Sequence, residues 1–241
     1  MIQIQTGEIS NGSKRLEWFR RLGWGRCFVA RPVTPLEGEN WFFDNGAFRA
    51  FRAGESFPTE KFTARLEKAV ATGRAPSFAV LPDIVAGGLE SLRFSLEWLD
   101  SGRLEASWDW FLAVQDGMTV EDVEPLLERG DIAGLFVGGS KDFKATAATW
   151  AALAHRYGLR CHYGRASGLG GLRKAIASGC DSADSAAILF SDMKFFRYAQ
   201  VWLEESVEDP DPIVVAWVEE QVARARIEER DRRRARVALA A

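Results

Sequence analysis

Short apolar runs alternate with amphipathic stretches along most of the chain. Most of the runs are rich in β-branched or aromatic residues, as buried parallel strands are: Ile2–Gln5, Cys27–Ala30, Trp41–Phe43, Phe78–Leu81, Trp110–Val114, Ile132–Val137, Arg160–Tyr163 and Cys180–Ala183. Stretches between them have the period of a helix: Thr59–Thr72, Leu89–Leu99, Thr119–Leu127, Ala145–Tyr157 and Leu169–Ala177. This alternation predicts a parallel sheet with right-handed crossovers, and eight strands in 241 residues match a (β/α)8 TIM barrel.

An open, doubly wound sheet is the alternative fold. It is less favoured because neither GxGxxG nor GxxxxGK[ST] follows the first apolar run, as a nucleotide-binding sheet of that class would require. No linker separates two domains. We therefore expect one barrel over residues 1–205 and a C-terminal extension over residues 206–241, in which Ile213–Ala241 forms a helix.

The C-terminal extension carries an arginine-rich segment, residues 224–236, with the sequence RARIEERDRRRAR. Its seven arginines and three acids give it a charge of +4, which leaves −7 for the rest of a chain whose net charge is −3. One interpretation is a solvated helix face with i,i+4 ion pairs such as Glu228–Arg232. The other is an arm that contacts phosphate groups. The sequence leaves both open.

Composition excludes several classes of protein. With 47% hydrophobic and 27% charged residues the chain is neither disordered nor fibrous, and its net charge argues against binding nucleic acid through bulk positive charge. Three scattered cysteines and two histidines predict neither a disulfide framework nor a zinc site. The first residues lack the pattern of a signal peptide, and no apolar run approaches the ~20 residues that span a bilayer. We expect a soluble, cytoplasmic protein without a membrane partner.

Polar and glycine residues follow the predicted strands at their carboxyl ends. One such residue is explained by a helix cap or a turn, but their recurrence predicts a shared site, because these ends converge on one face of a barrel. Carboxylates, one amide and aromatic rings suit chemistry on a polar heterocycle or a sugar better than acyl transfer. The segments are Asp44 to Phe48, Pro82-Asp83, Gln115 to Gly117, Gly138 to Ser140, Gly164-Arg165, and Asp181 with Asp184.

The motifs DNGAF, PD, VQDG, GLFVGGS, HYGR and GCDSADS occur in this order between Trp41 and Ser185. In order and placement the series resembles the tRNA-guanine transglycosylase superfamily, and in character its short DpdA-type branch, which puts 7-deazaguanines into DNA. The resemblance implies a (β/α)8 barrel that exchanges guanine for a 7-deazaguanine such as preQ0 through a covalent intermediate. It implies neither a metal nor a redox cofactor.

The resemblance also implies roles for individual residues. Asp184 matches the nucleophile that attacks C1′ of the nucleoside, and Asp44 matches the general acid/base at the base. Asp181 is the alternative nucleophile. The remaining matches contact the base: Asp83 at its polar edge, Gln115, Gly138 and Gly139 beside it, and Phe48 and Tyr163 stacked on the ring.

Basic residues near these motifs have two interpretations. Arg165, directly after a predicted strand, is a candidate phosphate clamp or a surface ion pair. Lys144 is expected in a solvated loop, and His162 receives no role.

The chain departs from the tRNA enzymes at its C-terminal end. Those enzymes carry a zinc subdomain with three cysteines and a histidine, whereas neither residue type follows Cys180 here. That subdomain supports tRNA binding and dimerisation, so we expect no zinc subdomain, favour DNA over tRNA as partner, and leave the oligomeric state open. The alternatives are the same exchange on tRNA, an N-glycosidase acting on nucleosides, and a base-binding module without catalysis.

Overall fold

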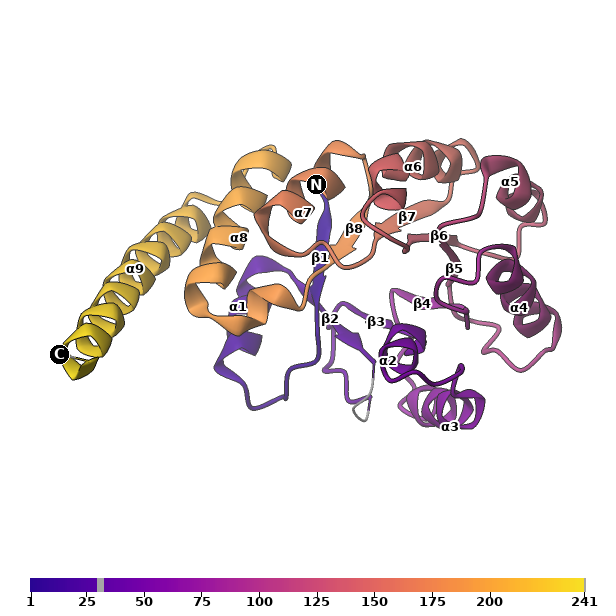
Figure 1. Cartoon of the computed structure of the whole chain (residues 1–241), viewed down its shortest axis with the longest axis horizontal. Coiled ribbons are helices and arrows are strands. Elements are labelled where there is room, and N and C mark those ends of the chain that lie inside the picture. The colour runs from indigo at the N-terminus through magenta and orange to yellow at the C-terminus, as the bar shows by residue number, and fades with distance from the viewer. Residues whose placement is uncertain (30–32, 241) are drawn as a thin grey trace.

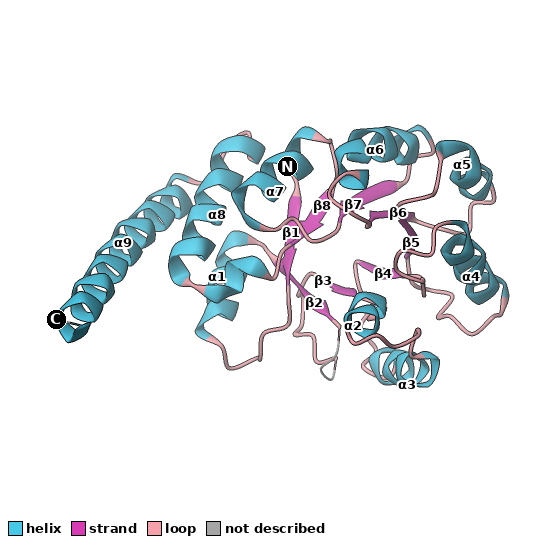
Figure 2. Ribbon diagram, viewed as in Figure 1, coloured by secondary structure: helices cyan, strands magenta, loops and turns pink. Residues whose placement is uncertain are grey.

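Eight parallel strands form a closed barrel in the computed structural model, which describes residues 1–29 and 33–240. They pair in chain order, with the last strand returning to the first (Figures 1 and 2). The prediction of a TIM barrel is confirmed. The strands are β1 Gln3–Thr6, β2 Gly25–Phe28, β3 Trp41–Phe43, β4 Phe78–Val80, β5 Trp110–Val114, β6 Gly134–Val137, β7 Arg160–Tyr163 and β8 Ser182–Asp184.

Helices surround the barrel, but their distribution is uneven (Figure 2). Among the described residues of the β2–β3 connection there is no helix, whereas two helices follow β3. Helical periodicity in the sequence did not predict α1, α2 or α8. The helices are α1 Lys14–Leu22, α2 Ala47–Arg52, α3 Thr59–Val70, α4 Leu89–Asp100, α5 Val120–Glu128, α6 Ala147–Arg156, α7 Gly168–Ala177, α8 Asp192–Ser206 and α9 Pro212–Ala240, with short 3-10 helices at Phe143–Thr146 and Ala187–Phe190.

Several strand boundaries differ from the prediction. The expected strand at Cys27–Ala30 lies at Gly25–Phe28, and Ala30 falls outside the described residues. The expected strand at Cys180–Ala183 lies at Ser182–Asp184. Apolar content marks where a strand passes through the core, but pairing with its neighbours decides where the strand begins and ends.

Side chains along each strand alternate between the barrel interior and the surrounding helices. The interior is filled by stacked rings: Phe78 lies 4.7 Å from Phe42 and 4.2 Å from Phe111, centroid to centroid. Phe136 stacks on the imidazole of His162 at 4.8 Å. These rings form a floor across the barrel, so that any cavity at the carboxyl ends of the strands is closed from below.

Helix α9 lies outside the ring of helices and packs on α8 (Figure 1). Its buried side chains are Val218, Val222 and Ala225. Beyond Ala225 its described side chains are exposed or half-buried, and the helix extends away from the barrel. The predicted helix at Ile213–Ala241 therefore begins one residue earlier, and Ala241 lies outside the described residues. Within residues 1–29 and 33–240, no helix is both long and apolar enough to cross a membrane.

Candidate active site

A cavity opens at the carboxyl ends of strands β3 to β8. Eight of the nine residues predicted to form the site line it, and they come from six different strand ends or the loops that follow them. The structure therefore brings together residues up to 140 positions apart in the sequence. The lining residues are Asp44, Asn45, Phe48, Val80, Asp83, Val85, Ala113, Gln115, Phe136, Gly138, Gly139, Arg165 and Asp184.

Asp184 is the last residue of β8, and its carboxylate is held from one side. Oδ1 accepts a hydrogen bond from the backbone N–H of Arg165 at 2.7 Å and lies 3.2 Å from Nε2 of His162. The left-handed backbone of Arg165, with φ of 54°, turns this N–H toward the carboxylate. Oδ2 has no hydrogen-bond donor among the residues that the structure describes. One carboxylate oxygen is thus fixed, and the other is available to a ligand.

The tautomer of His162 follows from its two neighbours. The residue is fully buried, and burial lowers its pKa, so the ring is neutral at pH 7. A carboxylate can only accept, so Nε2 carries the hydrogen toward Asp184. Nδ1 then accepts from the hydroxyl of Ser182 at 2.8 Å. The adjacent strands β7 and β8 place His162 opposite Ser182, and this pairing orients the imidazole.

Asp181 lies at the other end of β8. Its Oδ2 accepts from the backbone N–H of Cys161 at 2.7 Å and pairs with His155 at 3.0 Å on the surface. Asp181 does not line the cavity, so of the two acids in the GCDSADS motif only Asp184 is placed to meet a ligand there.

Asp44 follows β3 and faces the same cavity. Burial raises the pKa of Asp44 to about 6, against the lowering effects of the hydrogen bond from the Gly46 N–H, 2.7 Å from Oδ1, and of the Arg65 guanidinium. The side chain of Arg65 donates to the backbone carbonyl of Asp44 and lies over the ring of Phe43. Near neutral pH, Asp44 can therefore both give and take a proton.

Asp83 is a second buried acid, after the neighbouring strand β4. Asn45 donates to its Oδ1 at 2.7 Å and to the carbonyl of Leu81 at 2.6 Å. Burial raises the pKa of Asp83 to about 7, although the hydrogen bond from Asn45 opposes this shift. Asp83 therefore exchanges between donor and acceptor near neutral pH, which suits contact with the polar edge of a heterocycle. The role of Asn45 was not predicted from the sequence.

The raised pKa values of Asp44 and Asp83 make the free energy of unfolding depend on pH in a defined direction. A carboxyl whose pKa is raised by folding stabilises the protein fully below its unfolded pKa near 3.8, and that contribution is lost as pH rises through about 7. We expect Asp83→Asn, which keeps the oxygen that accepts from Asn45, to lose less stability than wild type between pH 5 and pH 8, by on the order of 2 kcal/mol. Urea unfolding at the two pH values measures this difference. Parallel losses in both proteins would contradict it, and Asp100→Asn, an exposed acid, is the control.

Gln115 lines the cavity, but its amide is occupied by the protein. Nε2 donates to the hydroxyl of Ser91 at 2.7 Å and to the carbonyl of Ile84 at 2.9 Å, and it lies 3.4 Å from Asp83. Oε1 accepts from the N–H of Ala86 at 2.6 Å. Gln115 therefore holds the β4–α4 loop in place, and its contact with a base stays a prediction.

Phe48 and Arg165 close the cavity from above. The Arg165 guanidinium lies over the Phe48 ring, 4.0 Å from its centroid, and donates to the carbonyl of Gly139 at 3.0 Å. Phe48 is 38% exposed. An aromatic face that accepts a guanidinium can also stack a flat ligand.

The double glycine forms the wall next to Asp116. Gly139 has φ of 73°, and a Cβ at this position would meet Oδ2 of Asp116 at 2.6 Å. That carboxylate accepts hydrogen bonds from both the N–H and the hydroxyl of Ser140. Only glycine fits between this clamp and the cavity, and it leaves backbone facing the ligand space together with Gly138.

The predictions for Tyr163 and Lys144 need correction. Tyr163 is adjacent in β7 to the inward-facing His162, so it points outward and packs in the core between strands and helices. Phe136 supplies an aromatic ring inside the cavity instead. Lys144 is not in a solvated loop: it is buried, donates to the carbonyl of Gly164 at 2.5 Å, and burial lowers its pKa to about 8.

The acids of the cavity lie on separate strand ends rather than in one cluster. In the described part of the chain, no group of three or more His, Cys, Asp or Glu side chains is arranged to hold a metal ion. What these side chains can do by themselves is accept a hydrogen bond, transfer a proton or attack an electrophilic carbon.

Comparisons with known proteins do not assign this chain to a family. No protein-family model matches the chain, and no curated protein matches it. Among the solved structures that match is a chain of a cube-shaped, highly porous protein cage designed by fusing symmetric oligomeric domains. It is 11% identical, with a TM-score of 0.42, and the match covers 99% of this chain and 80% of that chain. At this level of similarity the match says nothing about the chemistry of the cavity.

Proposed function

We propose that this chain is a guanine transglycosylase that replaces guanine in DNA with a 7-deazaguanine such as preQ0, through a covalent intermediate on Asp184. The observation that carries the proposal is the carboxylate of Asp184, which is fixed through Oδ1 and open at Oδ2, in a cavity shared with Asp44 and Asp83. The motif resemblance from Trp41 to Ser185 supports the same assignment.

In the first half of the reaction, Oδ2 of Asp184 attacks C1′ of the nucleotide. The bond between C1′ and N9 breaks, and the guanine leaves with the bonding electron pair. Asp44 supplies the proton that the departing base requires, because a group with a pKa of about 6 keeps a protonated fraction near neutral pH. The product is a glycosyl ester of Asp184, as in retaining glycosidases.

In the second half, the incoming 7-deazaguanine occupies the site of the departed guanine. Asp44, now ionised, removes its N9 proton, and N9 attacks C1′ and releases the carboxylate of Asp184. Both bases present N1–H and N2–H₂ donors, which Asp83 accepts when ionised. Phe48 and Phe136 offer rings against which the base stacks.

The decisive experiment supplies purified protein with labelled preQ0 and, in separate reactions, with DNA or tRNA. Label in DNA supports the proposal, and label in tRNA alone corrects the nucleic acid. Release of guanine without replacement indicates an N-glycosidase. No reaction with either substrate by a folded protein overturns the proposal and leaves a base-binding module.

His162 positions the nucleophile in this scheme. His162→Leu removes the donor to Asp184 Oδ1, and we expect adduct formation to slow by about 10- to 100-fold, comparable to the loss of one charge-assisted hydrogen bond. His162→Gln retains an N–H donor at a similar reach and should recover most of the rate. Single-turnover trapping of the adduct measures both. A merely structural role would make the two variants equally slow, because both disturb the ring stack of the floor.

A further inference from the structure

The second half of helix α9 stands apart from the body of the protein. Ala225 is the last buried side chain among those described on this helix, and the helix continues to Ala240 with seven arginines and three acids between residues 224 and 236. An exposed helix of this length gains little from packing, so its charges decide how stable it is and what it can contact.

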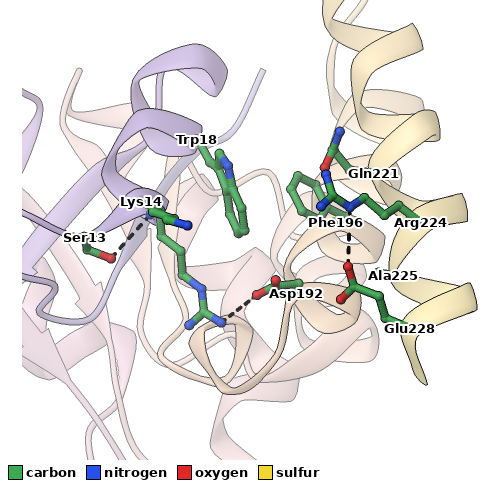
Figure 3. Close-up of a pocket in the computed structure, with 10 residues that line it drawn as sticks. Ser13, Lys14, Trp18, Asp192, Phe196, Gln221, Arg224, Ala225 and Glu228 are labelled. Carbon is green, nitrogen blue, oxygen red and sulfur yellow. Dashed lines mark hydrogen bonds and ion pairs between the residues drawn. The ribbon is translucent and has the colours of Figure 1, made fainter. Parts of the chain in front are cut away.

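One face of this segment has its charges paired within the protein. Glu228 lies 3.4 Å from Arg224 and 3.6 Å from Arg232, both at i,i+4 spacing. Arg224 and Glu228 line a groove between α9, α1 and α8 (Figure 3). On the other side of that groove Arg15 pairs with Asp192 at 2.8 Å. These charges are largely neutralised, so this side of α9 attracts a polyanion weakly.

A different face carries a stripe of arginines. Positions i, i+4, i+7 and i+8 share one side of a helix, and here they are Arg226, Arg230, Arg233 and Arg234. Arg230 lies 3.5 Å from Asp231, while the other three have no acidic partner in residues 1–29 and 33–240. Two pairs of the stripe, Arg226 with Arg230 and Arg230 with Arg234, are like charges at i,i+4, an arrangement that destabilises a helix.

We propose that this arginine stripe, formed by Arg226, Arg230, Arg233 and Arg234, binds the sugar–phosphate backbone of a nucleic acid. The proposal rests on the proposed function, because it names how the same substrate is held outside the cavity. A polyanion supplies the counter-charge that the protein does not, and it relieves the repulsion within the stripe. At 1.5 Å per residue the stripe spans about 12 Å, which matches three to four phosphates along a duplex at about 3.4 Å per phosphate of one strand.

The test compares two variants with equal changes in charge. In the stripe variant, Arg226, Arg230, Arg233 and Arg234 become glutamine. In the control, four arginines from surface ion pairs become glutamine: Arg156, Arg173, Arg224 and Arg232. Fluorescence anisotropy measures Kd for a labelled duplex, a single DNA strand and an RNA hairpin between 50 and 300 mM salt, values on the scale over which phosphate contacts are resolved.

We expect the stripe variant to bind the duplex at least about 10-fold more weakly at 100 mM salt. Its slope of log K against log salt should be shallower by about 3, because each neutralised phosphate contributes roughly 0.9. The control should stay within about 3-fold of wild type. Equal Kd and slope in wild type and stripe variant would overturn the proposal. So would loss of binding to anionic phospholipid vesicles without any loss for nucleic acid.

Base exchange is scored separately, so that the two proposals can fail independently. If wild type binds DNA through the stripe but exchanges no base, the transglycosylase proposal fails and the stripe stands. If both proteins exchange bases equally well at DNA concentrations below Kd, the stripe proposal fails and the transglycosylase stands. At saturating DNA, the adduct on Asp184 should form equally in both, because the stripe lies outside the cavity.

Discussion

Asp184→Asn is expected to abolish the covalent adduct between this protein and guanine-containing DNA, with base exchange falling by at least about 1,000-fold. An amide cannot trap C1′ as an ester, so the step itself is removed rather than slowed. Asparagine keeps the oxygen that accepts from the Arg165 N–H and from Nε2 of His162, and the surrounding contacts survive the change. Denaturing gel electrophoresis of the trapped complex measures the adduct, and unfolding by urea checks that the fold is intact.

The matched control is Asp181→Asn, the other acid of the same motif. Its carboxylate sits at the far end of β8 against Cys161 and His155, so exchange should proceed close to the wild-type rate. An unchanged adduct in Asp184→Asn, or a lost one in Asp181→Asn, would refute the assignment of the nucleophile.

The second large effect is expected from Asp44→Asn, which should slow adduct formation by about 100- to 10,000-fold, the usual contribution of one positioned acid or base. The variant keeps the oxygen that accepts from the Gly46 N–H, so the turn after β3 is preserved. Stopped reactions that follow the first half of the exchange give the rate.

The pH profile gives Asp44 a signature that a structural role would lack. Its protonated form is the acid in the first half-reaction, and that form declines as pH rises through about 6. The rate of adduct formation by wild type should therefore fall as pH rises across this value. This falling limb of the pH–rate profile should be missing in Asp44→Asn. An identical limb in both proteins would assign it to another group. Glu90→Gln, an exposed acid on α4, serves as the control.

The sequence predicted the barrel because strand and helix periods alternate, and it predicted most of the cavity because strand ends converge. It did not predict which side chains of a strand face inward. Tyr163 and His162 are neighbours, and alternation alone allows either to face the cavity; the bond between His162 and Ser182, across two strands, settles it. Phe136 is a β6 side chain that faces the barrel interior, but from the sequence alone it looks like an ordinary core residue.

Contacts between distant segments could not be predicted from the sequence either. The stack of Arg165 on Phe48 joins residues far apart in the chain, and no local pattern in either motif encodes it. Lys144 is buried because Tyr163 at the end of β7 and the carbonyl of the next residue, Gly164, lie against it. The segment before it, Ser140 to Asp142, is polar and resembles a surface loop.

The floor of stacked rings divides the barrel into two ends with separate tasks. Below it, Arg160 bridges Asp109 and the carbonyl of Ser77 while its guanidinium lies under Phe111, and none of these residues lines the cavity. Many enzymes lose activity when they are made more stable, because both properties depend on the same residues. We therefore expect substitutions that stiffen the end opposite the cavity, or a tag inserted there, to leave the geometry of the cavity unchanged.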